Sequence, residues 1–176
     1  MSARDKVFER FLSTQYDEAM ELDAASDLVT VIPCGQRPCR QFLTVFLGTG
    51  LVRTPSGEIE RANHFEVLIT FPDDYLRRAT PGEVVAWIGP PNVWHPNILP
   101  PLLCVGRLKP GTPLVSLIYQ IHEIITYRKA TMDELDALNH PACQWARENK
   151  QMFPIDPRPL KRRRVTFRVE TLQEGC

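Results

Sequence analysis

The chain has 176 residues, of which 43% are hydrophobic, and this suits one compact domain with a core of its own. Its 21 Lys and Arg residues balance 21 Asp and Glu residues, so no overall field draws it toward nucleic acid or an anionic membrane. No apolar run approaches the roughly 20 residues of a membrane span, and Arg4, Asp5 and Lys6 stand where a signal peptide would be apolar. We expect a cytoplasmic protein with no nucleic-acid or membrane partner.

The five cysteines are an odd number in a chain that can bury its own core, which argues against a secreted disulfide framework. We interpret them as free thiols. Cys34 and Cys39 have the spacing of half a zinc site, but no second ligand pair stands at a convincing spacing, so we predict no metal and no organic cofactor. Cys143, between apolar neighbours, is predicted to be a small core residue.

The first elements are a helix and two strands. Apolar side chains recur at helical spacing over residues 3–22, with charged residues opposite, and this predicts an amphipathic N-terminal helix. Residues 28–32 and 42–47 are β-rich and predict a hairpin. The link between them, residues 33–38, contains glycine and prolines and is expected to continue neither strand.

Two further strands are predicted before the region of greatest interest. Residues 65–71 alternate between apolar and polar side chains, and residues 84–88 form a short β-rich run that ends at a Gly-Pro-Pro sequence. The prolines that follow are expected to prevent regular structure as far as Cys104. Cys104 is therefore predicted in or just after a stiff, irregular loop.

The second half of the chain predicts two helices. One begins at Pro113 with Thr112 as its N-cap and ends near Thr126, and its apolar spacing marks it as the core helix. The other covers about residues 141–152, with Asn139 as its cap. A helix, a strand meander, a loop and two helices together predict an α+β fold.

The sequence changes character at Pro154. We place one domain at residues 1–153 and a C-terminal extension at 154–176, which contains the basic run 161–164 and an alternating segment, 165–169, with the pattern of a short strand. The basic run is interpreted as a solvated segment. The sequence assigns no role to this extension.

Cys104 is the best candidate for chemistry. A thiolate readily attacks an activated carbonyl, and the resulting thioester stays reactive toward an amine. Asn97 stands seven positions before it and can donate an amide N–H to the oxyanion of the tetrahedral intermediate. The alternative is that His95, Pro96 and Asn97 only shape a turn.

A cysteine hydrolase would need a base beside the thiol. His122 on the predicted core helix is the candidate for such a dyad, but nothing in the sequence orders it against Cys104. A lone histidine on a helix is more often an edge residue of the core.

Several motifs, in the right order, resemble those of the ubiquitin-conjugating enzymes, and the resemblance spans nearly the whole chain to Met152. The matching segments are Phe71-Pro72-Asp73-Asp74-Tyr75-Leu76, His95-Pro96-Asn97, Cys104, Thr112-Pro113-Leu114 and the region from Asn139 to Asn149. The resemblance implies the fold of that family, with an N-terminal helix, a four-stranded antiparallel meander sheet and C-terminal helices.

The resemblance also implies a function. An activating enzyme passes the C-terminal carboxyl of a ubiquitin-like protein to Cys104, and the thioester is then given to an amine, commonly a lysine of a target protein, with or without a ligase. ATP is used by the activating enzyme. Asn97 supports the attack and His95 braces the loop, so the candidate catalytic set is Cys104, Asn97 and His95.

The family's acidic residue that orients the incoming lysine falls in residues 131–136, where Asp133, Glu134 and Asp136 all qualify. Each of these carboxylates is equally interpretable as a solvated surface group.

The chain departs from the family pattern near the cysteine. The spacing from Asn97 to Cys104 is slightly shorter, and Val105 and Gly106 replace a Leu-Asp pair. Such departures indicate that the chain resembles a divergent member of the family. We place it with the bacterial ubiquitin-like conjugation systems associated with phage defence. A non-catalytic scaffold of the same fold, which binds a ubiquitin-like protein, is the alternative.

Overall fold

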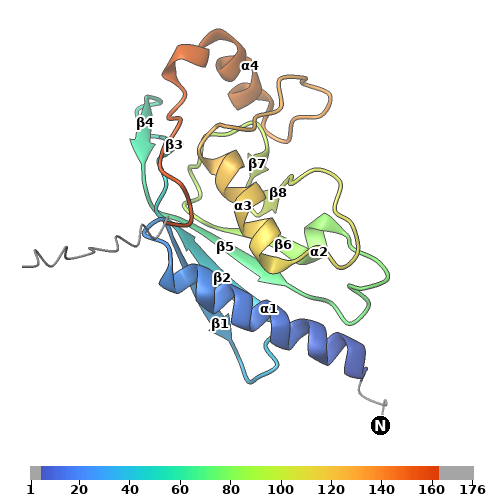
Figure 1. The fold of residues 1–176 in the computed structure, drawn as a ribbon. Coiled ribbons are helices and arrows are strands. Elements are labelled where there is room, and N and C mark those ends of the chain that lie inside the picture. Colours follow the sequence, from blue (N-terminus) through green and yellow to red (C-terminus); the bar gives the residue numbers. More distant parts are fainter. Residues whose placement is uncertain (1–4, 163–176) are drawn as a thin grey trace, which may run out of the picture.

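A four-stranded antiparallel sheet, covered on one face by two helices, is the framework of the protein (Figure 1). The computed structural model describes residues 5–162. The expected α+β class, with its N-terminal helix and four-stranded antiparallel sheet, is confirmed. In chain order the elements are α1 (Lys6–Ala24), β1 (Val29–Cys34), β2 (Gln41–Phe46), β3 (Gly50–Arg53), β4 (Ile59–Ala62), β5 (Phe65–Thr70), α2 (Pro81–Val84), β6 (Val85–Gly89), β7 (Ile98–Leu99), β8 (Leu102–Leu103), α3 (Leu114–Ile125), α4 (His140–Glu148) and the 3-10 turn η1 (Lys150–Met152).

The sheet has the strand order β1-β2-β5-β6, and every pair of neighbours is antiparallel. Successive side chains of a strand point to opposite faces, so one face of the sheet is buried and the other is partly exposed. Phe42 and Phe46 of β2 and Phe65 of β5 lie on the buried face. They share one core with the apolar side of α3, whose buried residues include Leu114, Leu117, Ile118, Ile121, Ile124 and Ile125.

Helix α1 begins slightly later than predicted, and it also holds the start of α3. Asp5 caps α1 by accepting the N–H groups of Val7 at 3.0 Å and Phe8 at 3.2 Å. Gln15, a buried polar residue of α1, accepts the N–H of Leu114 at 2.7 Å, which satisfies one of the free donors at the start of α3. Two helices distant in sequence are thereby fixed against each other.

The prediction that Thr112 caps α3 is wrong. Pro113 occupies the cap position with an extended ψ of 149°, and Thr112 donates its hydroxyl to the carbonyl of Lys109 at 2.7 Å. The side chain of Gln15 supplies the acceptor that the local sequence was expected to supply. A cap from another helix leaves no local sequence signal.

Strand β1 continues through Pro33 and Cys34, so the prediction that the link 33–38 continues neither strand is wrong at this end. Proline is tolerated because β1 is an edge strand. The backbone nitrogen of Pro33, which has no hydrogen, can face the open edge of the sheet and not β2. The N–H groups of Val29 and Val31 are met by the side chains of Ser26 at 3.2 Å and Asp23 at 2.8 Å. The outer edge of β1 therefore offers few donors.

The hairpin of β3 and β4 was not predicted, because the glycines and proline in this stretch are typical of loops between strands. Gly50 lets the chain pass close to the core, since a Cβ there would lie 2.7 Å from the ring of Phe65. On its other side β3 contacts the segment after β6: Trp94 donates its N–H to the carbonyl of Leu51 at 2.8 Å. The hairpin thus fixes the approach to His95.

The prediction that prolines prevent regular structure up to Cys104 is also wrong. β7 and β8, each two residues long, form an antiparallel hairpin. Pro100 and Pro101 occupy its turn, where no N–H is needed for pairing between the strands. Trp87 of β6 donates its N–H to the carbonyl of Pro101 at 2.9 Å, so the hairpin lies against the end of the sheet. Cys104 follows directly after β8.

Helix α4 is shorter than predicted. Asn139 is its cap, as expected, and accepts the N–H of Ala142 at 3.2 Å. The helix ends at Glu148, where the side chain of Asn149 donates to the carbonyl of Trp145 at 2.9 Å, and a separate 3-10 turn follows. Cys143 is fully buried, which confirms its assignment to the core.

The first part of the C-terminal extension, residues 154–162, packs against the domain. Leu160 is buried, and Arg162 donates its N–H to the carbonyl of Ala25 at 2.9 Å, just after α1. Lys161 pairs with Glu21 of α1 at 3.0 Å. The strand predicted at 165–169, the end of the basic run and Cys176 lie outside the described residues.

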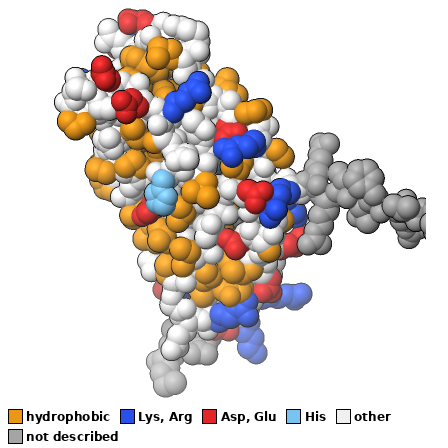
Figure 2. Space-filling view, turned by 90° about the vertical axis from the view of Figure 1, so that its left-hand side faces the viewer, with side chains coloured by type: hydrophobic (Ala, Val, Ile, Leu, Met, Phe, Trp, Pro, Cys, Tyr) orange, Lys and Arg blue, Asp and Glu red, His pale blue; other side chains and the backbone are white. Residues whose placement is uncertain are grey.

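On the side seen in Figure 2, charged side chains of both signs are interspersed among hydrophobic ones. Ile32 of β1 and Ile88 of β6 are among the exposed apolar side chains, at 44% and 50% of their surface. Within residues 5–162, no helix combines the length and the apolar character that crossing a membrane requires.

Candidate active site

His95 is buried and braces a tight turn. Its Nδ1 accepts the N–H of Asn97 at 3.0 Å, and Ile98 donates its N–H to the carbonyl of His95 at 3.2 Å. The ring meets Tyr127 edge-on, with 4.4 Å between centroids. Burial lowers the pKa of His95 to about 3, against an opposing contact with the backbone of Lys129. His95 is therefore neutral at pH 7 and holds the turn.

The turn places Asn97 beside Cys104. The carbonyl of Asn97 accepts the N–H of Cys104 at 2.8 Å, and its Nδ2 donates to the carbonyl of Cys104 at 3.4 Å. Asn97 is 7% exposed, whereas Cys104 is partly exposed at the end of the β7–β8 hairpin. The structure thus places the predicted amide donor against the backbone of Cys104, the residue that carries the predicted thiol, and Cys104 is partly exposed.

Thr131 completes this cluster and was not identified from the sequence. Its Oγ1 accepts a hydrogen bond from Asn97 Nδ2 at 2.8 Å, and its N–H donates to Asn97 Oδ1 at 2.9 Å. Cys143 donates its thiol to the carbonyl of Thr131 at 3.4 Å. Because these residues are far apart in sequence, no local pattern could have joined them.

The loop after α3 is fastened to the turn at both ends. Tyr127, with a φ of 58°, directs the chain away from the helix and donates its hydroxyl to the carbonyl of Trp94. At the other end Leu138 and Asn139 both donate N–H groups to the carbonyl of Pro96 at 3.0 Å. Burial raises the pKa of Tyr127 well above its ordinary value, so its hydroxyl remains a donor.

The three acidic candidates on this loop differ in their contacts. Asp133 accepts the N–H of Leu135 at 3.0 Å, and Glu134 forms an ion pair with Arg147 of α4. The carboxylate of Asp136 has no such partner within residues 5–162, although its backbone N–H donates to Asp133 at 3.3 Å. All three side chains are exposed.

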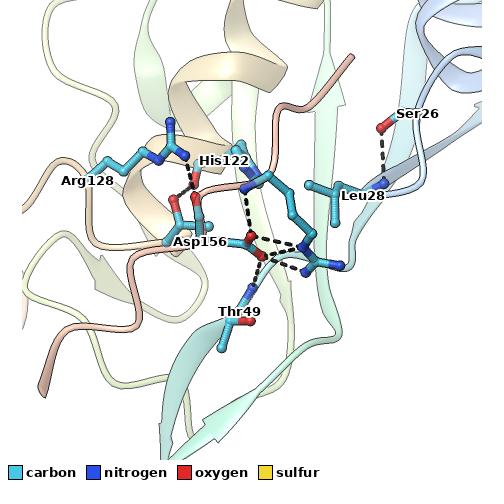
Figure 3. Close-up of polar contacts among 8 residues, drawn as sticks. Ser26, Leu28, Thr49, His122, Arg128 and Asp156 are labelled. Carbon is cyan, nitrogen blue, oxygen red and sulfur yellow. Dashed lines mark hydrogen bonds and ion pairs between the residues drawn. The ribbon is translucent and has the colours of Figure 1, made fainter. Parts of the chain in front are cut away.

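His122 lies in a different polar cluster (Figure 3). That cluster is centred on the buried side chain of Asp156, which accepts the N–H of Thr49 at 3.3 Å and a guanidinium N–H of Arg158 at 2.6 Å. Arg128 donates to the backbone carbonyl of Asp156. His122 therefore belongs to this cluster, and not to a dyad with Cys104.

Burial shapes the charge of this second cluster. It lowers the pKa of His122 to about 4, with further lowering from Arg128 and Arg158 and an opposing effect from Asp156. The hydrogen bond from Arg158 holds the pKa of Asp156 well below its usual range. Neither ring nitrogen of His122 has a hydrogen-bond partner among the described residues.

Cys34 and Cys39 contact backbone groups of their own turn. Cys34 Sγ lies 3.6 Å from the carbonyl of Ile32, and the buried Cys39 Sγ lies 3.7 Å from the carbonyl of Gly35. In the part of the chain that the structure describes, no three His, Cys, Asp or Glu side chains gather as a metal site would require.

The assembled site contains two groups suited to catalysis: a partly exposed cysteine, Cys104, and an amide donor, Asn97 Nδ2, that contacts the backbone carbonyl of that cysteine. Such a pair suits acyl transfer, in which a nucleophile forms a covalent intermediate and a donor meets the oxyanion. No protein-family model matches the chain, and no curated protein matches it.

Proposed function

We propose that the protein is a ubiquitin-conjugating-like acyltransferase that carries a ubiquitin-like protein as a thioester on Cys104 and transfers it to a lysine of a target. The observation that carries the proposal is the pairing of Asn97 with Cys104 by a backbone bond of 2.8 Å and a side-chain bond of 3.4 Å. The partial exposure of Cys104 favours transfer over a purely scaffolding role, because a carrier thiol must be reached by both donor and acceptor.

The chemistry takes two balanced steps. In the first, the Cys104 thiolate attacks the thioester on the activating enzyme, forms a new thioester and releases that enzyme's thiolate. In the second, a neutral lysine amine attacks the carbonyl, and the oxyanion accepts a hydrogen bond from Asn97 Nδ2. Collapse of the intermediate forms the amide, expels the Cys104 thiolate and releases the proton of the amine to solvent.

The arrangement of the elements supports a ubiquitin-conjugating fold. α1 precedes a sheet whose strands follow one another in chain order apart from the inserted β3–β4 hairpin, and α3 crosses the same face. Two of the matching motifs also contact each other: Tyr75 donates its hydroxyl to the carbonyl of Thr112 at 2.8 Å. Burial raises the pKa of Tyr75 to about 12, so this donor persists at neutral pH.

Of the three acidic candidates, Asp136 fits the lysine-orienting role best. The carboxylates of Asp133 and Glu134 are engaged by Leu135 and Arg147. Asp136 lies on the loop that contacts the Asn97 turn through Leu138. A carboxylate here would attract the cationic lysine and accept a proton from it.

The partners follow from the reaction. An activating enzyme supplies the thioester, a ubiquitin-like protein is the cargo, and a target lysine, with or without a ligase, is the acceptor. We propose that the reaction takes place in the cytoplasm. The sequence resemblance supports placing the system with the bacterial conjugation pathways of phage defence.

The proposal is tested without knowledge of the activating enzyme. A ubiquitin-like protein with a small-thiol C-terminal thioester should exchange onto Cys104 and release the small thiol, giving an adduct that reductant cleaves. Cys104→Ala should form none. Cys34→Ala is the matched control, because Cys34 is also partly exposed, and it should form the adduct normally. An adduct that survives Cys104→Ala would overturn the proposal.

A further inference from the structure

The amide of Asn97 is held by two hydrogen bonds that run in opposite directions. Asn97 Nδ2 donates to Thr131 Oγ1 at 2.8 Å, and the N–H of Thr131 donates to Asn97 Oδ1 at 2.9 Å. Because one bond needs a donor and the other an acceptor, together they fix the plane of the amide and determine which end is nitrogen.

The remaining hydrogen of Nδ2 is directed toward Cys104. Its contact with the Cys104 carbonyl, at 3.4 Å, is longer than an ordinary N–H···O bond and therefore the weakest of the three. An acyl group on Cys104 would bring an oxyanion to this donor, and the long bond is the one most easily exchanged. The donor is best oriented while the hydroxyl of Thr131 accepts the other hydrogen of Nδ2.

We propose that Thr131 is a positioning residue whose hydroxyl orients the amide of Asn97 for transfer from Cys104. The inference rests on the proposed function and deepens it. Thr131 does not itself touch the reacting atoms. It acts by keeping Asn97 in the rotamer that presents Nδ2, at a site where pre-orientation of a donor contributes directly to the rate.

Thr131 is itself held independently of its hydroxyl. Its carbonyl accepts the thiol of Cys143 at 3.4 Å, and the end of its loop is fastened through Leu138 to Pro96 at 3.0 Å. Its backbone bond to Asn97 survives a change of side chain. Thr131→Val therefore removes one hydrogen bond while nearly preserving shape, and Thr131→Ser retains it.

The test is single-turnover discharge of the Cys104 thioester to free lysine. Loss of one hydrogen bond to Asn97 should lower the maximal rate of Thr131→Val about three- to tenfold, with the half-saturating lysine concentration unchanged. Thr131→Ser should discharge at close to the parental rate. In an Asn97→Ala background, Thr131→Val should have no further effect, because the group that it positions is gone.

The inference fails if Thr131→Val discharges normally, or if Thr131→Ser is no faster than Thr131→Val. It also fails if the double variant Asn97→Ala, Thr131→Val discharges more slowly than Asn97→Ala by the same factor that Thr131→Val shows alone. The side-chain N–H signals of Asn97 in ¹⁵N-labelled protein give an independent readout. They should shift in Thr131→Val and keep their positions in Thr131→Ser. If the parental protein forms no thioester, the proposed function fails, while these signals still decide whether Thr131 holds Asn97; unshifted signals in Thr131→Val would overturn the inference.

Discussion

The two buried histidines, His95 and His122, lie in polar clusters that differ in how the imidazole ring is hydrogen-bonded. His95 shares its hydrogen bonds with a turn that ends beside a partly exposed thiol. His122 has neither ring nitrogen paired among residues 5–162, and it lies beside Asp156, whose contacts fasten the C-terminal segment to the core. The first cluster contacts a partly exposed cysteine, Cys104, whereas the residues described for the second cluster include no cysteine. Burial alone therefore does not mark a functional histidine.

The largest effect should come from the first cluster. Asn97→Ala should form the Cys104 thioester normally but discharge it to lysine about a hundred- to a thousandfold more slowly, since loss of one oxyanion donor typically costs about 2.7–4 kcal/mol. Measurement of charging and discharge on the same sample separates the two steps. Equal losses in both would return Asn97 to a structural role in the turn.

The second cluster should affect stability and leave chemistry unchanged. Asp156→Asn loses charge-assisted bonds to Arg158 and should lower the free energy of unfolding by about 2–3 kcal/mol, with discharge from Cys104 unaltered. Glu21→Gln is the matched control, because the exposed pair of Glu21 with Lys161 fastens the same segment and should be worth less than about 1 kcal/mol. Urea unfolding would measure both free energies. Equal losses would show that the buried Asp156 contacts stabilise the fold no more than the exposed pair of Glu21 and Lys161.

Acid should reveal the second cluster in two separate pH ranges. His122 has its pKa lowered from 6.5 to about 4, so its contribution is present above pH 6.5 and is lost as the pH falls toward 4, because the unfolded chain binds the proton first. The loss is on the order of 3 kcal/mol. The pKa of Asp156 is lowered, so its ionised carboxylate stabilises the fold at any pH above the ordinary pKa of an aspartate. That contribution is lost as the pH falls below about 4.

His122→Leu isolates the first of these ranges. It should unfold at pH 7 with a free energy equal to or above that of the parent, because an apolar group of similar size replaces two unpaired nitrogens. Its stability should fall less between pH 6.5 and 4. Destabilisation at pH 7 would show that the ring nitrogens are satisfied in solution.

The smallest effect should come from the acidic loop. Asp136→Asn should slow discharge to lysine up to about fivefold, within the range of an exposed charge pair. Glu134→Gln, whose parent carboxylate is engaged by Arg147, should have no effect on discharge. The reverse result would assign the lysine-orienting role to Glu134.

The sequence was sufficient where structure depends on local periodicity. The stripes of α1 and α3 and the alternation of β5 were predicted close to their observed positions. It failed where prolines and glycines were treated as ends of strands, since β1 runs through Pro33 and the β7–β8 hairpin turns at Pro100. In both cases the proline occupies a position that needs no ladder N–H.

The candidate site was half visible in the sequence. The proposed nucleophile, Cys104, and the proposed donor, Asn97, are close in sequence, and both belong to the motifs that carry the family resemblance. Thr131, which holds the donor, and Gln15, which caps α3 from α1, make contacts between residues far apart in sequence. Such contacts exist only once the chain is folded, and no spacing rule applies to them.

The outer edge of β1 has a consequence for the behaviour of the protein at high concentration. The side chains of Ser26 and Asp23 engage the donors of Val29 and Val31, and Pro33 has no donor. A strand from another molecule laid along this edge would meet acceptors without the matching donors, and half of the bonds of a continued sheet would be missing. The protein should therefore resist aggregation by edge-to-edge growth from β1, a property that would suit the carrier function proposed for Cys104.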